Sequence, residues 1–318
     1  MFRIQTLAGG LLAIGVPISQ AFACSSCGCT LSSDWASQGY AAEEGLRIDM
    51  RFDYFDQDQL RAGTHSVSRS SIEIPTDREV QQSTLNRNYT LSIDYSPNAD
   101  WGFNLQIPYF NRFHTTIAEG DTDISASHTE SMGDIRFLVR YQGLSADHTT
   151  GVQAGIKFAT GSFDNNFISG PQQGNLLDRG LQPGTGTTDL LVGIYHFGTL
   201  SRDWDYFAQA YVQQPLNYRD DFRPGTGINA NAGVRYVGFG KVTPHLQLNV
   251  RAEKRESGAE ADVDNSGATL VYLSPGVTVI PSHHVSAYGF VQLPVYQRVN
   301  GLQIEPRYTA SAGLHYAF

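Results

Sequence analysis

Three cysteines near the N-terminus are the residues of this chain best suited to metal or redox chemistry. Cys24, Cys27 and Cys29 are the only cysteines among the 318 residues. In an oxidising compartment two of them can pair, which leaves one over. Alternatively, their thiolates bind copper, zinc or a redox partner, although so few neighbouring ligands do not specify a metal. The spacing therefore leaves open a disulfide-bonded or inert tail and a metal or redox site.

Serine and histidine pairs in the C-terminal region have the residue types of a hydrolase but not its geometry. Ser311 and His315 are four residues apart on one strand face, and that spacing corresponds to about 13 Å. His284 is two residues from Ser286. Neither pair by itself can be a nucleophile and its base, which must be in hydrogen-bond contact. Because no nucleophile elbow, phosphate loop or spaced metal-histidine motif is present, we predict that the protein is not an enzyme.

The C-terminal residues alternate without a break between an apolar and a polar or small face. Tyr308, Leu314, Tyr316 and Phe318 share the apolar face, which is the period of a strand between an apolar and a wet phase. Such an aromatic last strand is typical of an outer-membrane barrel, where it closes against the first strand so that no backbone edge faces lipid. The pattern also predicts that Phe318 is recognised by the barrel assembly machinery.

The N-terminal residues predict export. Arg3, an apolar run at residues 7–18 and Ala21-Phe22-Ala23 form a signal peptide over residues 1–23. The mature chain would begin at Cys24, with a lipid on Cys24 as the alternative. Residues 24–45 are then a periplasmic segment with the cysteine cluster and a short helix. No other stretch has the roughly 18 apolar residues of a membrane-spanning helix.

Charge and composition exclude several classes of partner. The formal net charge is −9, which argues against nucleic acid or an anionic membrane surface as a partner. Aromatic residues make up 11% of the chain, and 32 of its residues are glycines. A β-barrel fits this composition, because only every second residue of each strand must be apolar.

Twelve alternating segments follow the N-terminal region. The even number fits a bacterial single-chain barrel. We therefore predict an all-β fold, a single twelve-stranded antiparallel transmembrane β-barrel of the outer membrane of a Gram-negative bacterium, over residues 46–318. The segments lie at 46–56, 87–96, 101–113, 134–142, 150–160, 188–197, 204–216, 227–237, 242–254, 267–279, 284–296 and 305–318.

The connections between these segments predict the orientation of the barrel. Residues 58–83, 115–131 and 162–187 form long polar connections, whereas residues 96–100 and 238–241 form short turns. Long extracellular loops and short periplasmic turns are the pattern of outer-membrane barrels. Aromatic residues at the strand ends, such as Trp101 and Trp204, predict girdles at the two membrane interfaces.

Several motifs resemble a family of outer-membrane transporters of the phenol meta-degradation type. The resemblance spans most of the predicted barrel, and its motifs mark strand starts and turns. It implies uptake of a small aromatic or other hydrophobic compound. The sequence departs from the family where Phe158-Ala159 replaces the frequent Leu-Pro. The matching stretches are 132–141, 155–161, 183–189, 272–276 and 292–301.

The charged residues of the strands are predicted to face the lumen, because a polar lumen is the one place in a membrane that accommodates them. Opposite charges recur among them, so they form either an ion-pair network that supports the interior or a pathway for a polar or anionic solute. The set is Asp49, Arg51, Asp53, Arg87, Asp94, Arg112, Asp134, Arg136, Arg140, Lys157, Asp189, Arg235, Arg251, Glu253 and Arg307.

The sequence Gln-x-Pro recurs in three of the predicted strands that run from the periplasmic to the extracellular side. Gln106, Gln213 and Gln292 each precede a proline by two residues. Proline cannot donate to a β-ladder, so each motif is expected to break strand pairing locally. Either the prolines simply end their strands, or the three glutamines form an uncharged constriction able to hydrogen-bond a phenol or carboxylate.

These features predict a channel or transporter for a small molecule, with outer-membrane lipid, the assembly machinery and the solute as its partners. The alternative is a barrel scaffold or conduit that is coupled through Cys24, Cys27 and Cys29 to a periplasmic metal-handling or redox partner. No cofactor is expected apart from the metal of that alternative.

Overall fold

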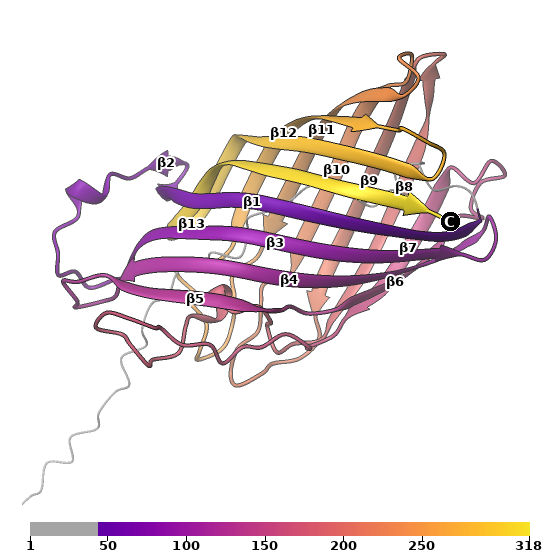
Figure 1. Cartoon of the computed structure of the whole chain (residues 1–318). Helices are drawn as coiled ribbons and strands as arrows, with labels where there is room; N and C mark the ends of the chain where they lie inside the picture. Colours follow the sequence, from indigo (N-terminus) through magenta and orange to yellow (C-terminus); the bar gives the residue numbers. More distant parts are fainter. Residues whose placement is uncertain (1–43) are drawn as a thin grey trace, which may run out of the picture.

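The structure is an antiparallel β-barrel. The computed structural model describes residues 44–318, so the predicted signal peptide, the cysteine cluster and the predicted short helix lie outside the described residues. Within residues 44–318, no helix is long and apolar enough to cross a membrane. The sheet contains 13 strands, and all except β2 and β5 follow one another around the wall in the order of the chain (Figure 1).

The strands differ in length around the barrel. β2 and β5 lie off the main wall, because β2 pairs only with the end of β1, and β5 pairs with the part of β4 that extends beyond β6. The bounds are β1 Gly45–Gly63, β2 His65–Ser66, β3 Val80–Ser96, β4 Trp101–Ile117, β5 Ser125–Met132, β6 Arg136–Tyr141, β7 Thr150–Lys157, β8 Asp189–Ser201, β9 Trp204–Pro215, β10 Gly227–Tyr236, β11 Val242–Glu253, β12 Ala268–Val279 and β13 Val285–Ala317.

Pairing between β13 and β1 closes the sheet. The first part of β13 pairs with β12 and its last part pairs with β1, from Arg47 opposite Ala317 up to Gly63. Gly301, between these parts, has a positive φ of 59°, a conformation that glycine adopts without steric cost. The Phe318 amide donates to the Leu46 carbonyl at 3.0 Å, which continues the ladder beyond the last strand residue.

The predicted strand count needs a correction. The segments predicted at 284–296 and 305–318 form one continuous element of 33 residues, β13. β2 and β5 were not predicted, and β1 and β3 extend well beyond their predicted ends at residue 56 and residue 87. These extensions carry polar residues on both faces, so apolar alternation does not reveal them.

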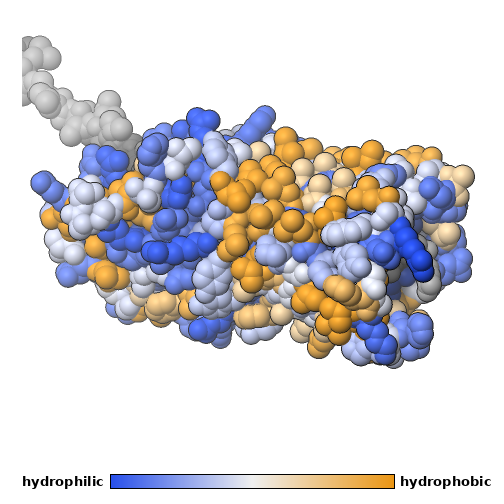
Figure 2. Space-filling model, turned by 90° about the horizontal axis from the view of Figure 1, so that it is seen from above, coloured by the Kyte–Doolittle hydropathy of each residue, from blue (hydrophilic) through white to orange (hydrophobic). Residues whose placement is uncertain are grey.

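Alternation along the strands separates an apolar outer face from a polar inner face. Met50, Ile194 and Leu314 are 51%, 53% and 61% exposed, whereas Asn249 and Thr309, on the opposite parity, are fully buried. Figure 2 shows apolar residues gathered on the wall and hydrophilic residues at the end that carries the long connections. Trp101 and Trp204 are exposed at the other end, where each packs against a tyrosine.

Aromatic side chains on the inner face lie over glycines of neighbouring strands. Phe290 covers Gly276 and Tyr288 covers Gly313, so that a Cβ at either glycine would overlap the ring. Tyr195 lies over Gly151 in the same way. These contacts allow large rings to lie flat against the wall, which keeps them from projecting across the lumen.

Replacing Gly276 by valine is expected to destabilise the barrel by about 1–3 kcal/mol, because the added methyl groups must displace the Phe290 ring. Urea unfolding in detergent, followed by tryptophan fluorescence, measures the effect. Gly227→Val is the matched control, since the nearest atom to a Cβ there is 4.0 Å away. Equal stability of the two variants would show that the ring does not need the glycine.

Candidate functional site

The lumen holds most of the residues that the sequence predicts for it. Asp49, Arg112, Arg140, Lys157 and Arg235 are buried on the inner face. Arg51, Gln106, Arg136, Gln213, Arg251 and Glu253 share the inward parity of their strands and are partly exposed.

Arg87 and Arg307, which were predicted to face the lumen, do not lie on the inner face. Arg87 is exposed on the outward face of β3 and pairs in register with Tyr54. Arg87 and Asp94 are an odd number of residues apart on one strand, so they must face opposite sides. Arg307 is exposed beside register shifts between β1 and β13, and its guanidinium binds Asp58 at 3.1 Å.

Asp94 is the centre of an ion-pair cluster near the end of the barrel that carries the short turns. The Arg140 guanidinium donates to both carboxylate oxygens, at 2.5 and 3.0 Å, and Arg47 donates at 2.8 Å. Arg140 passes over Gly102, where any Cβ would overlap its guanidinium. The sequence analysis missed Arg47, although it shares the parity of Asp49.

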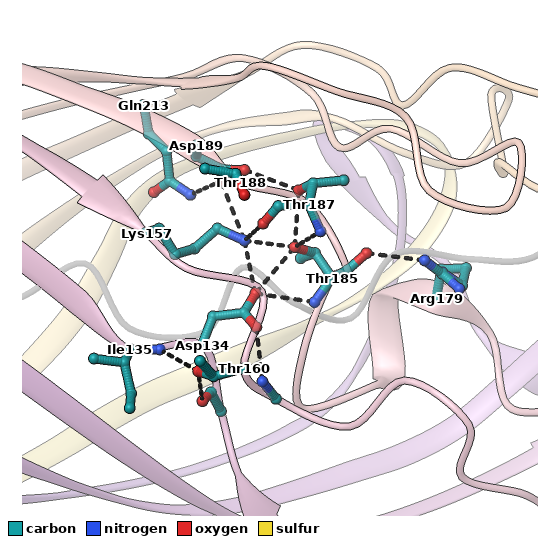
Figure 3. A network of polar contacts seen from close by, with 12 residues as sticks. Asp134, Ile135, Lys157, Thr160, Arg179, Thr185, Thr187, Thr188, Asp189 and Gln213 are labelled. Carbon is teal, nitrogen blue, oxygen red and sulfur yellow. Dashed lines mark hydrogen bonds and ion pairs between the residues drawn. The ribbon is translucent and has the colours of Figure 1, made fainter.

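Lys157 joins two carboxylates of the inner wall (Figure 3). Its ammonium lies 2.6 Å from Asp134 and 3.4 Å from Asp189, and all three side chains are buried. The Lys157 ammonium also donates to the Thr187 carbonyl at 3.0 Å. The Thr185 amide donates to Asp134 at 3.0 Å. The cluster therefore ties the wall to the connection between β7 and β8.

This connection, residues 158–188, lies against the inner wall, and we call it the plug segment. Phe167, Leu177 and Leu181 form its buried apolar cluster. From β4, the inward-facing Arg112 donates to the Leu181 carbonyl at 2.7 Å. The sequence predicts residues 162–187 as an extracellular loop, and its polar composition gives no sign that part of it packs inside the barrel.

The remaining lumenal arginines of the predicted set are mostly paired with carboxylates. Arg235 binds Asp205 at 3.2 Å and Arg251 binds Glu253 at 2.6 Å. Gln106 and Arg136 are opposite one another on β4 and β6, and neither side chain has a hydrogen-bond partner among residues 44–318. This partly exposed pair is the best placed of the predicted residues to contact a solute. Arg51 completes the paired group, since it binds Asp53 at 2.9 Å.

The three glutamines face inward but differ in their environment. Gln213 donates to Asp189 at 2.5 Å, Gln292 is 1% exposed, and Gln106 is partly exposed. A ring of three free amides is therefore not present in this conformation, and the constriction stays a prediction.

Two prolines of the three motifs lie at breaks in strand pairing, whereas the third only ends its strand. Pro108 lies where β4 changes partner from β6 to β5. Pro215 ends β9. Pro294 adjoins a register shift between β12 and β13.

The comparisons with known proteins identify the fold. No protein-family model and no curated protein matches the sequence. The structure is similar to an outer-membrane channel from Pseudomonas putida F1, with a TM-score of 0.62 and 12% identity over 87% of this chain and 96% of that one. At this identity the similarity shows the fold alone, which is that of an outer-membrane β-barrel.

Two further solved structures have lower scores. The β domain of the Bordetella autotransporter BrkA has a TM-score of 0.49 and 13% identity, over 87% of this chain and all of that one. The CymD monoaromatic hydrocarbon channel has a TM-score of 0.47 and 10% identity, over 91% of this chain and 94% of that one.

Replacing Lys157 by alanine is expected to destabilise the protein by about 3–5 kcal/mol, because Asp134 and Asp189 would remain buried without their cation. The midpoint of urea unfolding in detergent measures the loss. Arg255→Ala removes the exposed pair with Asp264 and is expected to change stability by about 0–1 kcal/mol. An equal effect of the two substitutions would contradict a structural role for Lys157.

Proposed function

We propose that the protein is a passive channel of the outer membrane of a Gram-negative bacterium, and that a small aromatic or other hydrophobic compound passes through it. The observation that carries the proposal is the closed barrel with an apolar outer face and a polar inner face. Such a wall satisfies its backbone groups internally, which a lipid environment requires. The fold similarity to an outer-membrane channel supports it.

We count the wall as twelve membrane-crossing segments. The two parts of β13 pair with different neighbours, and Gly301 lies between them with a positive φ. The Ala317 amide donates to the His284 carbonyl at 2.8 Å, so the beginning of β13 runs beside its end. Counted as two segments, β13 gives the even number that single-chain barrels have.

The orientation follows from the two ends of the barrel. The long connections, including the plug segment, would be extracellular, and the turns at 96–100 and 238–241 periplasmic. In this orientation the plug segment narrows the extracellular half of the lumen, so a solute meets it before the Gln106 and Arg136 pair. The barrel would reach the membrane through the assembly machinery.

The Gln106 and Arg136 pair suits a solute with a polar or negatively charged group. Arg136 supplies a cation, and Gln106 supplies an amide that donates and accepts hydrogen bonds. Most other lumenal charges of the predicted set are held in ion pairs, so they supply structure more than selectivity. The aromatic character of the solute rests on the motif resemblance in the sequence.

Planar-bilayer recordings test the channel directly. We expect discrete conductance steps, and a reduced current when phenol or benzoate is added. Arg136→Gln is expected to weaken the effect of benzoate several-fold while phenol keeps its effect, because only benzoate carries a charge. Arg255→Gln, at an exposed position, is the control. Absence of conductance and of solute uptake into liposomes would refute the channel.

The cysteine cluster offers a second function, which stays a prediction because Cys24, Cys27 and Cys29 lie outside the described residues. In that case the barrel would be a scaffold or conduit for a periplasmic metal-handling or redox partner. Replacing all three by serine separates the two functions, since a channel keeps its conductance and a metal or redox conduit loses its coupling to the partner.

A further inference from the structure

Four buried carboxylates from three segments interact at the edge of the plug segment. Glu79 precedes β3, Asp178 belongs to the plug segment, and Glu256 and Asp262 lie in the connection between β11 and β12. Each is at most 8% exposed. The charges of Glu256, Asp262 and Glu79 all act on Asp178. We call these four residues the carboxylate cluster.

Two oxygens of the carboxylate cluster have no hydrogen-bond partner. Asp178 accepts a hydrogen bond from the Gly180 amide through Oδ1, and Asp262 accepts two from Asn265 through Oδ1. The Oδ2 atoms of Asp178 and Asp262 are buried and unpartnered among residues 44–318. A buried carboxylate without a partner is costly when ionised, and a bound proton removes that cost.

Three basic groups lie near the carboxylate cluster, and the charge of Arg179 acts on Asp178 and Glu256. The Arg112 guanidinium donates to Asn86 and to the Leu181 carbonyl. Arg179 lies between the rings of Phe163 and Phe222 and donates to the Thr185 carbonyl. His114 of β4 donates or accepts at Thr84, and its other ring nitrogen is 3.9 Å from Glu79.

The carboxylate cluster adjoins the contact that holds the plug segment to the wall. Asp178 caps the short 3-10 helix Arg179–Leu181. The Leu181 carbonyl of that helix accepts the hydrogen bond from Arg112. Leu177, which precedes Asp178, and Leu181, the last residue of the helix, belong to the buried apolar cluster. Repulsion between the Asp178 carboxylate and its neighbouring carboxylates therefore acts directly on the plug segment.

The geometry points to a proton-dependent lock, in which the protonated carboxylate cluster holds the plug segment against the connection at residues 254–267 and the ionised carboxylate cluster releases it. Release would move the plug segment away from the wall and widen the extracellular half of the lumen. The consequence for conductance rests on the proposed channel function. The movement of the plug segment does not depend on that function.

The direction of the pH dependence follows from the two aspartates. Burial, with the nearby carboxylates, raises the pKa of Asp178 well above its usual range. Burial raises the pKa of Asp262 to about 6. The locked form therefore binds more protons than the released form between the ordinary aspartate pKa of 3.8 and these raised values. Its stability falls as the pH rises through that window.

Cysteine accessibility tests the lock without relying on conductance. Leu176 is 62% exposed and Leu177 is 3% exposed, so Leu177→Cys reports release and Leu176→Cys corrects for thiol ionisation. In a background with Cys24, Cys27 and Cys29 replaced by serine, a methanethiosulfonate reagent is applied between pH 4.5 and 8. We expect the ratio of the two labelling rates to rise with pH, by up to about tenfold per pH unit for one coupled proton.

The variant Asp178→Asn mimics the protonated side chain and is expected to keep the labelling ratio low at pH 8. Asp164→Asn, at an exposed position of the same plug segment, is the control and is expected to retain the pH dependence. A ratio that does not change with pH in the protein with the native Asp178 would overturn the lock. So would an equal response of the two asparagine variants.

Bilayer recordings at the same pH values separate this proposal from the channel itself. We expect conductance to increase with pH and Asp178→Asn to suppress the increase. If the protein never conducts, the proposed function fails, whereas pH-dependent labelling would still support the lock. Conductance that is equal at all pH values, with unchanged labelling, refutes the lock alone. If calcium chloride at pH 8 reproduces the low-pH labelling, a cation is the ligand and the proton lock is wrong.

Discussion

Pairing of the last strand with the first is the constraint on which this structure depends. A lipid-facing wall has no water to satisfy an open edge, so every backbone group must find its partner within the sheet. The ladder from Arg47 opposite Ala317 to Gly63 supplies that pairing. Closure in turn defines an inside and an outside, and the period of two along each strand then assigns every side chain to one of them.

Closure also determines where the charges go. Asp94 with Arg140, and Lys157 with Asp134 and Asp189, lie inside and are almost completely buried. A buried charge is tolerated when its partners are close and its remaining donors are satisfied. The interior is therefore a set of local ion-pair clusters joined to the wall, and the partly exposed Gln106 and Arg136 are an exception among the predicted residues.

The sequence reveals what depends on alternation and hides what depends on packing across the lumen. Asp49, Arg140 and Arg251 could be assigned to the inside because each lies on a regular strand with apolar neighbours on the other parity. Arg87 could have been assigned correctly from its odd spacing to Asp94. The direction in which Arg307 points depends on register shifts between β1 and β13, which the sequence pattern does not reveal. The fold of the plug segment was hidden for the same reason, because its contacts with Arg112 and Lys157 join residues far apart in sequence.

The plug segment is held by two kinds of contact that respond differently to their surroundings. Lys157 opposes Asp134 and Asp189 with a charge of the other sign, so the buried carboxylates of that contact have a cation between them. In the carboxylate cluster, burial and the neighbouring carboxylates outweigh the charge of Arg179 that also acts on Asp178, so the cluster is most stable when protonated. A rise in pH therefore weakens the contact at the carboxylate cluster. Thr185 and Thr187, near β8, are bound to Asp134 and Lys157. Because Asp178 precedes them, the end near β8 would act as a fixed hinge for a plug segment that is released near Asp178.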